Sequence, residues 1–188
     1  TMQMLSSRPE EKPLSVQIFG ADPGIMAEAA RIVEVSGADI LDINFGCSVK
    51  KILKSGSGAA LMRRPDLAEA VIRSVRAAIK IPLTIKIRTG WEKNGDDARI
   101  IARIAETEGV DAIAIHPRLA SQGFKGRADW QVISDIKQLI SIPVMGNGDI
   151  VIATPQKGGT TWMQGIVSNL LFAQGLPAPI SALSPWLD

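Results

Sequence analysis

The only cysteine of the chain, Cys47, directly follows the apolar segment 40–45 and precedes a loop rich in lysine and glycine. A thiol in such a loop can serve as a nucleophile or as a proton donor. Lysines close to the thiol would lower its pKa and favour the nucleophile, whereas lysines that bind phosphates would leave it protonated as an acid. A lone cysteine is also often a small buried hydrophobe, so its neighbours decide between these interpretations. The three lysines that follow it would suit a polyanionic substrate, and they are Lys50, Lys51 and Lys54.

Two further residues that could do chemistry, Lys86 and His116, occur toward the ends of predicted strands. In the segment TIKIR, alternation places Lys86 with its polar neighbours on one face of a strand. That face is either an exposed edge or the interior of a barrel, where a lysine needs an anionic partner such as a flavin ring. His116 is the only histidine, and it is either a structural hydrogen-bonding group or a catalytic one. Arg118 beside it could bind a phosphate.

Two weaker candidates also lie on predicted strands or directly after them. Asn147, Gly148 and Asp149 are a common turn signal, but their backbone N–H groups could also bind a phosphate or the ring oxygens of a ligand. The amide of Gln17 could bond a heterocycle or simply end its strand.

A regular alternation of strands and helices must position these residues. The pattern predicts strands over 14–19, 40–45, 83–87, 112–115 and 143–146, with helices over 23–35, 65–79, 96–108 and 130–140 between them. Strands separated by helices pair in parallel, and right-handed crossovers place every strand-to-helix loop at one edge of the sheet. The candidate residues of all five strands then converge, which favours a barrel over a doubly wound sheet.

The amino-acid composition argues against several classes of protein. The 188 residues suit one domain, and a hydrophobic fraction of 46% supplies a core. A net charge of +2 argues against a bulk nucleic-acid binder, and an aromatic fraction of 4% argues against base stacking on aromatic platforms. One cysteine excludes an internal disulfide and fits a cytoplasmic protein. We expect no signal peptide, no membrane span and no metal site.

Five sequence blocks, in this order, resemble the tRNA-dihydrouridine synthase family, especially its bacterial members. They read VQIFGADP, DINFGCSVKKILKSGSGAALM, TIKIRTGW, IHPRLASQGFKGRADW and PVMGNGDI, and they cover residues 14–150. The resemblance implies an FMN-containing TIM barrel that reduces uridine in tRNA with electrons from NADPH. Cys47 matches the cysteine that protonates C5 of uridine while reduced flavin delivers hydride to C6. The family's flavin-contacting positions fall on Gln17, Lys86, His116, Asn147, Gly148 and Asp149, and RNA is expected near Arg118, Lys50, Lys51 and Lys54.

Some positions depart from the family pattern. Ser48 stands where the family usually has proline, and Pro117 stands where it has glycine. The family's first two strands would precede Val16, and its eighth strand and helical domain would follow residue 150. We therefore expect a partial (β/α)8 barrel of about five parallel strands, whose two open edges could self-associate. The eighth strand helps bind the FMN phosphate, so FMN binding and activity are expected to be impaired.

The pattern changes at 150/151. We predict an N-terminal extension over 1–13, the partial barrel over 14–150 and a strand-loop-helix over 151–188. This last segment resembles the start of a cytosolic-type sulfotransferase, in which a loop binds the phosphosulfate of the donor. The matching residues are Lys157, Gly159, Thr160 and Thr161. The alternative is that this segment only packs on the open sheet. Two other functions are therefore weighed against the synthase, namely phosphosulfate binding and a non-catalytic α/β module with weak RNA binding.

Overall fold

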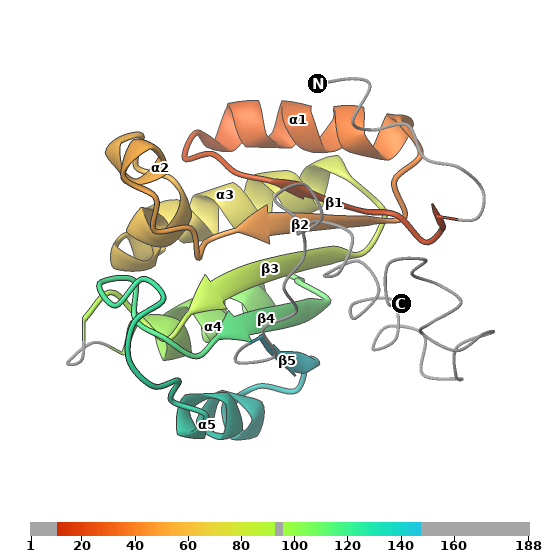
Figure 1. Ribbon diagram of the computed structural model, residues 1–188. Coiled ribbons are helices and arrows are strands. Elements are labelled where there is room, and N and C mark those ends of the chain that lie inside the picture. The colour runs from red at the N-terminus through yellow and green to blue at the C-terminus, as the bar shows by residue number, and fades with distance from the viewer. Residues whose placement is uncertain (1–10, 93–95, 148–188) are drawn as a thin grey trace.

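A parallel sheet with helices along one side forms the body of the protein (Figure 1). The structure is a computed structural model, and it describes residues 11–92 and 96–147. The strands are β1 (Ser15–Ile18), β2 (Ile40–Asn44), β3 (Leu83–Arg88), β4 (Ala112–His116) and β5 (Val144–Gly146). The helices are α1 (Pro23–Val35), α2 (Lys50–Lys54), the 3-10 helix η3 (Gly58–Arg63), α3 (Pro65–Ala78), α4 (Asp97–Thr107) and α5 (Gln131–Leu139).

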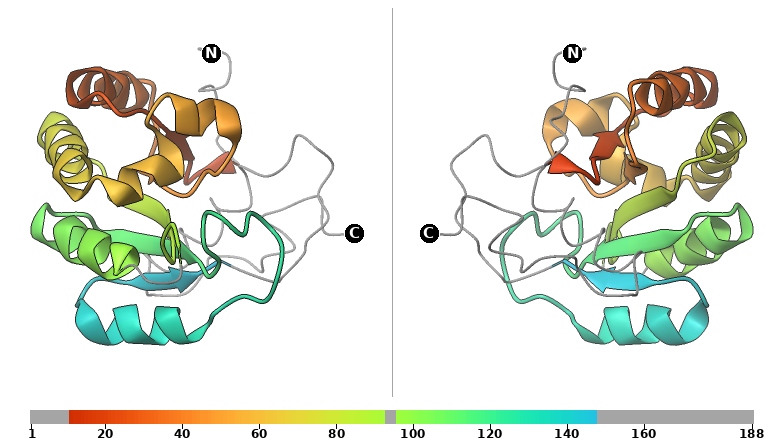
Figure 2. Two further views of the ribbon diagram at one scale, coloured as in Figure 1. Left: turned by 90° about the vertical axis from the view of Figure 1, so that its left-hand side faces the viewer. Right: turned by 90° about the vertical axis from the view of Figure 1, so that its right-hand side faces the viewer.

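The order of the strands in the sheet decides between the two predicted architectures. The sheet runs β1-β2-β3-β4-β5, with each neighbouring pair parallel. A doubly wound sheet reverses its strand order at a switch point, and no reversal occurs within the described residues. Helices α1, α3, α4 and α5 follow one another along one face of the sheet (Figure 2). The five parallel strands of the predicted partial barrel are therefore confirmed.

Most predicted boundaries agree with the structure within about two residues, but the segment after Cys47 does not. It was expected to be a loop because of its glycines, and it contains α2 and η3. Between residues 49 and 55 the sequence holds no glycine or proline, so one helical turn forms there. Gly56, between the two short helices, and Gly58, the first residue of η3, adopt positive φ angles of 75° and 62°.

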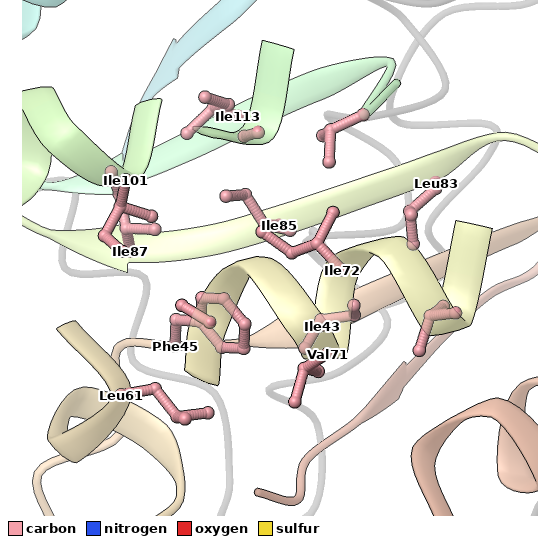
Figure 3. Packing of buried hydrophobic residues seen from close by; sticks show 14 of the residues in the cluster. Ile43, Phe45, Leu61, Val71, Ile72, Leu83, Ile85, Ile87, Ile101 and Ile113 are labelled. Carbon is pink, nitrogen blue, oxygen red and sulfur yellow. The ribbon is translucent and has the colours of Figure 1, made fainter. Parts of the chain in front are cut away.

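The core lies between the sheet and the helices. Apolar side chains at alternate strand positions, among them Ile43, Ile85 and Ile113, belong to one buried cluster with the apolar residues of α3 and α4 (Figure 3). Helix α3 buries Ala68, Val71, Ile72 and Val75, which share one face at helical spacing. The intervening strand positions face the other side of the sheet, which would be the interior of a closed barrel. There Ile40, Ala112, Ala114 and Met145 form a second, small apolar cluster.

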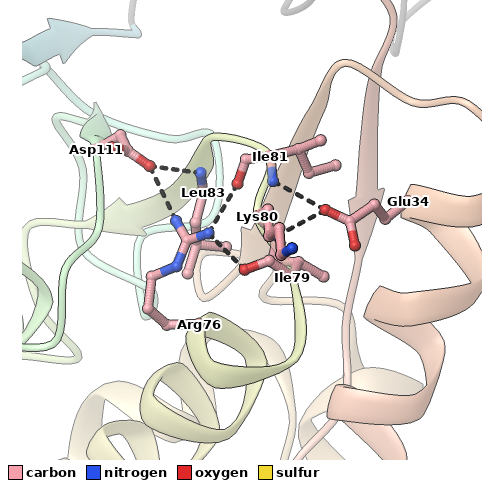
Figure 4. A network of polar contacts seen from close by, with 7 residues as sticks. All are labelled: Glu34, Arg76, Ile79, Lys80, Ile81, Leu83 and Asp111. Carbon is pink, nitrogen blue, oxygen red and sulfur yellow. Dashed lines mark hydrogen bonds and ion pairs between the residues drawn. The ribbon is translucent and has the colours of Figure 1, made fainter.

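A polar network joins the helices to the amino ends of the strands (Figure 4). The carboxylate of Glu34, on α1, accepts hydrogen bonds from the backbone N–H groups of Lys80 and Ile81, at 2.6 and 2.9 Å. These bonds hold the pKa of Glu34 below its usual value. Arg76, on α3, donates to the carbonyl oxygens of Ile79 and Ile81 and to the Asp111 carboxylate. This network therefore lies at the end of the sheet opposite the carboxyl ends of the strands, where barrels of this kind carry their active sites.

The outer strands of the described sheet are β1 and β5. Within the described residues, each pairs with one neighbour only. Self-association through these edges stays a prediction. No helix in the part of the chain that the structure describes is long and apolar enough to cross a membrane.

Candidate active site

A chain of hydrogen bonds holds the loop that carries Cys47. The Asn44 side-chain oxygen accepts from the backbone N–H groups of Gly46 and Cys47, at 3.0 and 2.8 Å. The Asn44 amide nitrogen donates to Gln17 Oε1 at 2.8 Å, and Gln17 Nε2 donates to Asp42 Oδ2 at 2.6 Å. Side chains of two adjacent strands, β1 and β2, thus fix the backbone at the start of the loop.

Asp42 anchors this chain at its buried end. Its side chain is 4% exposed, and its second oxygen accepts a hydrogen bond from Thr84 Oγ1 at 2.6 Å. Burial raises the pKa of Asp42 to about 6, against the opposing effects of its two hydrogen bonds and of Lys86. At neutral pH the group is therefore mainly an ionised carboxylate that only accepts hydrogen bonds.

Close packing fixes the rest of the Cys47 loop. The Cys47 carbonyl oxygen accepts from the N–H of Ala59 at 3.0 Å. A Cβ atom at Gly58 would lie 2.6 Å from that same oxygen, and Gly58 has a φ of 62°. Only glycine satisfies both conditions. The thiol side chain itself is half-buried.

Lys86 lies beside Asn44 in the parallel pairing of β2 and β3. Burial lowers the pKa of its ammonium group, and the Asp42 carboxylate partly offsets this effect. The backbone carbonyl of Lys86 accepts a hydrogen bond from the N–H of Phe45 at 2.7 Å, but among the described residues no group is hydrogen-bonded or ion-paired to its ammonium group. A half-buried cation of this kind favours a negatively charged or electron-rich ligand.

Arg88 ties the Cys47 loop to the loop that follows β4. Its side chain is 4% exposed, and its Nε donates to the Gly46 carbonyl oxygen at 2.7 Å. Its Nη1 donates to the carbonyl oxygens of Leu119 and Gly123, at 3.1 and 2.7 Å. One guanidinium therefore sets the distance between the two loops, a geometry that a lysine could not reproduce.

His116 ends strand β4. Its Nδ1 lies 3.4 Å from Asn147 Oδ1, and its buried Nε2 has no hydrogen-bond partner among the described residues. Burial, together with the positive charge of Arg88, lowers the pKa of His116 to about 4. The ring is therefore neutral at physiological pH, and one buried ring nitrogen is left for a ligand.

One pocket brings these groups together. It has a volume of about 170 Å³ and is lined by Asn44, Gly46, Cys47, Ser48, Val49, Lys86, Arg88, His116 and Phe124. Cys47, Lys86 and His116 thus share one pocket, as the convergence of strand ends predicts. Gln17 does not line it but bonds to Asn44, which does.

The predicted RNA-contacting residues lie outside this pocket lining. Lys50, Lys51 and Lys54 are exposed on α2. Arg118 is partly exposed, and its Nε donates to the Gly126 carbonyl oxygen at 3.2 Å. The remaining predicted site residues lie outside the described residues, namely Gly148, Asp149, Lys157, Gly159, Thr160 and Thr161.

Comparison with known proteins places the chain in a family. A sequence profile described as "Dihydrouridine synthase (Dus)" matches residues 1–166. The chain belongs to the dihydrouridine synthase family. The match extends past the boundary predicted at 150/151 into residues outside the described part, so that boundary stays a prediction.

Several curated members of the dihydrouridine synthase family are similar to the chain. It is 42% identical over 148 residues to "Probable tRNA-dihydrouridine synthase 1" of Synechocystis sp., covering 79% of this chain and 42% of the relative. It is 41% identical over 171 residues to "tRNA-dihydrouridine synthase B" of Pseudomonas aeruginosa, covering 89% and 51%. The protein of the same name from Shewanella oneidensis is 46% identical over 185 residues, covering 98% and 55%. The chain spans about half the length of the curated relatives it matches.

Sequence reasoning missed three residues that line the pocket, namely Asn44, Arg88 and Phe124. It also missed Asp42, which does not line the pocket but bonds to Gln17. Asn44 precedes Cys47 by three residues, and an asparagine that bonds the N–H groups following it is a known turn signal. Asp42 and Arg88 share the strand alternation that identified Lys86. Phe124 carried no signal, because a single aromatic residue in a loop has no periodicity.

We searched the described part of the chain for side chains that could together bind a metal ion. Within those ranges, no three His, Cys, Asp or Glu side chains gather closely enough to hold an ion.

Proposed function

We propose that this chain takes part in the flavin-dependent reduction of uridine to dihydrouridine in tRNA. The observation that carries the proposal is the single pocket in which Cys47, Lys86 and His116 meet, in a chain that belongs to the dihydrouridine synthase family. The names of the relatives supply the substrate, tRNA, and a tRNA substrate agrees with the predicted cytoplasmic location.

The polar groups around the pocket fit an FMN ring. The buried Nε2 of His116 and the half-buried ammonium of Lys86 both require a ligand, and the oxygen and nitrogen atoms at the edge of a flavin ring supply one. Gln17 and Asn147 do not line the pocket but bond to Asn44 and His116, which do, and we propose that they complete this set as FMN approaches. A pocket of about 170 Å³ is smaller than the roughly 300 Å³ of a full small-molecule site, so it suits one part of such a ligand. FMN, when bound and reduced by NADPH, supplies the hydride for C6 of uridine.

The protein's own contribution centres on the Cys47 thiol. The three lysines of α2 do not line the pocket, which favours a proton donor over a lysine-activated nucleophile. Asn44 holds the backbone N–H of Cys47 and so fixes where the Sγ–H can reach uridine C5. Lys86 stabilises negative charge that develops beside it, and His116 acts as a neutral hydrogen-bonding group because its pKa is about 4.

The surface around the pocket suits a polyanion. Lys50, Lys51 and Lys54 project from the short helix that follows Cys47, and we propose that they bind RNA phosphates together with Arg118. Substituting one of the lysines would then weaken binding for every RNA sequence and reduce its salt dependence.

The test combines flavin binding with product formation. Purified protein is titrated with FMN, and the protein is also expressed in cells that lack their own dihydrouridine synthases, whose tRNA is then analysed by mass spectrometry. We expect a low level of dihydrouridine with the wild type, because FMN binding is expected to be impaired. Relative to that level, we expect a loss of about 100-fold or more in Cys47→Ala, because a positioned general acid contributes on that order. Lys86→Ala should weaken FMN binding instead. Absence of both FMN binding and dihydrouridine in the wild type would refute the proposal.

A further inference from the structure

The chain of hydrogen bonds that leads from Asp42 to the Cys47 loop has a direction. Gln17 Nε2 donates to Asp42 Oδ2 at 2.6 Å, and Asn44 Nδ2 donates to Gln17 Oε1 at 2.8 Å. At the other end, Asn44 Oδ1 accepts from the N–H groups of Gly46 and Cys47, at 3.0 and 2.8 Å. Both side-chain amides therefore turn their nitrogen toward Asp42 and their oxygen toward the thiol loop.

The two amide groups do not set this direction by themselves. The oxygen and the nitrogen of an amide are similar in size, so an amide that turns over exchanges a donor for an acceptor and keeps its shape. Gln17 and Asn44 could therefore bond to each other in either direction. The groups at the two ends of the chain must decide between the two directions.

Both ends of the chain require the same direction. The backbone N–H groups of Gly46 and Cys47 can only donate, so they need the oxygen of Asn44. An ionised Asp42 can only accept, so it needs the nitrogen of Gln17. Asp42 is 4% exposed, so water is a poor substitute for that donor. In a reversed chain, donors would face donors beside the thiol, and acceptors would face acceptors at Asp42.

The neighbouring strands favour the ionised form of Asp42. It pairs with Gln17 on β1 and with Thr84 on β3, and both side chains donate to it, Thr84 Oγ1 at 2.6 Å. Burial raises the pKa of Asp42 to about 6, while these two hydrogen bonds and the charge of Lys86 oppose the increase. Among the described residues, Lys86 is the charged side chain that acts on Asp42. At neutral pH, this end of the chain is therefore an acceptor.

We propose that Asp42 is a positioning residue for the reaction, because its carboxylate fixes the direction of both amides. The oxygen of Asn44 then always faces the N–H groups beside the thiol. Asp42 acts through Gln17 and Asn44 and does not itself line the pocket. This inference rests on the proposed role of Cys47 as the proton donor, since a donor is effective only where its position is fixed.

The first experiment reads the direction of the chain in the full wild-type protein, without FMN or RNA. NMR detects scalar couplings across a hydrogen bond, between the donor nitrogen and the carbon that bears the acceptor oxygen. At neutral pH we expect couplings from Gln17 Nε2 to Asp42 Cγ and from Asn44 Nδ2 to Gln17 Cδ. A coupling from Gln17 Nε2 to Asn44 Cγ would show the reversed direction and would overturn the proposal.

The second experiment exchanges the acid and the amide at two positions and measures amide hydrogen exchange by NMR. Gln17→Glu places a carboxylate where Asp42 needs a donor, and the two groups repel each other when both are ionised. The amides of Gly46 and Cys47 should then exchange about tenfold faster than in the wild type at about pH 8. Two close carboxylates share a proton at lower pH, so this excess should disappear toward about pH 5.

Asp42→Asn should accelerate the exchange of these amides about threefold, because an amide at position 42 accepts either direction of the chain. The double variant, Gln17→Glu with Asp42→Asn, should return to the wild-type rate. The amide at position 42 then donates to the carboxylate at position 17, which still accepts from Asn44. A role in packing alone would not produce this repair, because neither exchange restores a lost contact.

Thr84→Val is the matched control. It removes the other hydrogen bond to Asp42 but no link of the chain, so the two amides should exchange at the wild-type rate. Thermal unfolding shows which variants are folded, and if Gln17→Glu is not, the couplings in the wild type and the rate in Asp42→Asn still decide.

Two results of the exchange experiment would overturn the proposal. One is a double variant in which the two effects add. The other is wild-type exchange in Asp42→Asn. Since no measurement needs FMN, RNA or reduction, an absence of dihydrouridine would count against the proposed reaction and not against the positioning of the loop.

Discussion

At the scale of single residues, the position of the thiol depends on a side chain that does no chemistry itself. Asn44 accepts from two consecutive N–H groups, those of Gly46 and Cys47, and donates to Gln17. Because each hydrogen bond in this chain orients the next amide group, the buried carboxylate of Asp42 helps to fix the position of the Cys47 loop. Such a chain of positioning groups allows a half-buried thiol to meet a substrate at a fixed distance.

The substitution Asn44→Ala should release the start of this loop. Its two N–H groups lose their acceptor, so we expect the amides of Gly46 and Cys47 to exchange with solvent about tenfold faster. The measurement is hydrogen exchange by NMR at neutral pH. Asn147→Ala, which alters the His116 side of the pocket, serves as the control and should leave these two amides unchanged. Equal exchange in Asn44→Ala and wild type would show that Asn44 does not hold the loop.

Asp42 should give the stability of the protein a distinctive pH dependence. Its pKa is raised from 3.8 to about 6 in the folded state, mainly by burial, so the folded protein binds its proton more tightly than the unfolded chain does. The stabilisation from this group is therefore complete below about pH 4 and is lost as the pH rises through 6, a loss of about 3 kcal/mol by pH 7.

Urea unfolding of wild type and Asp42→Asn between pH 4 and pH 7 tests this sign. The isosteric amide does not titrate, so the free energy of unfolding of the wild type should fall relative to the variant across this range. The carboxylates with lowered pKa, such as Glu34 and Glu108, act in the opposite direction but cancel in the difference. If the difference in the free energy of unfolding between wild type and Asp42→Asn stayed constant with pH, the raised pKa of Asp42 would be wrong.

At the scale of elements, the turn between α2 and η3 controls how the Cys47 loop closes. Gly58 combines a φ of 62° with backbone contact to the Cys47 carbonyl oxygen. Gly58→Ala should therefore cost about 1–3 kcal/mol in strain and should also displace Cys47. Gly37 is the matched control, because it has a φ of 87° but nothing within 4 Å of an added Cβ.

Alkylation of the Cys47 thiol by iodoacetamide reports the displacement. We expect both alanine variants to unfold at lower urea concentrations, but only Gly58→Ala to change the alkylation rate. An equal alkylation rate in the two variants would mean that the glycine contact does not position the thiol.

At the scale of the whole molecule, the sequence predicted the parallel sheet because apolar runs such as Ile40–Asn44 alternate with amphipathic helices such as Pro65–Ala78. It also placed Cys47, Lys86 and His116 together, since parallel strands end at one edge. It missed α2, because the surrounding glycines outweighed a single helical turn. It also missed the links made by Asp42 and Arg88, because hydrogen bonds between distant strands leave no local pattern in a sequence.

The two ends of the strands have separate roles, because the stabilising network of Arg76 lies at the amino ends and the pocket lies at the carboxyl ends. This separation can be tested. Arg76 makes three hydrogen bonds at the edge remote from the pocket, to Ile79, Ile81 and Asp111. Arg76→Met should lower the free energy of unfolding by about 2 kcal/mol, because it leaves two backbone carbonyl groups without their donor. Urea unfolding measures this loss.

Arg99→Met supplies the comparison for that experiment. Arg99 forms an exposed ion pair with Asp135 at 2.7 Å, and such pairs contribute about 1 kcal/mol or less. Under native conditions neither variant should alter the alkylation rate of Cys47 or the affinity for FMN, because neither arginine lines the pocket. If Arg76→Met changed the thiol reactivity of the folded protein, the amino ends and the carboxyl ends of the strands would be coupled. The stabilising network would then also help to position the site.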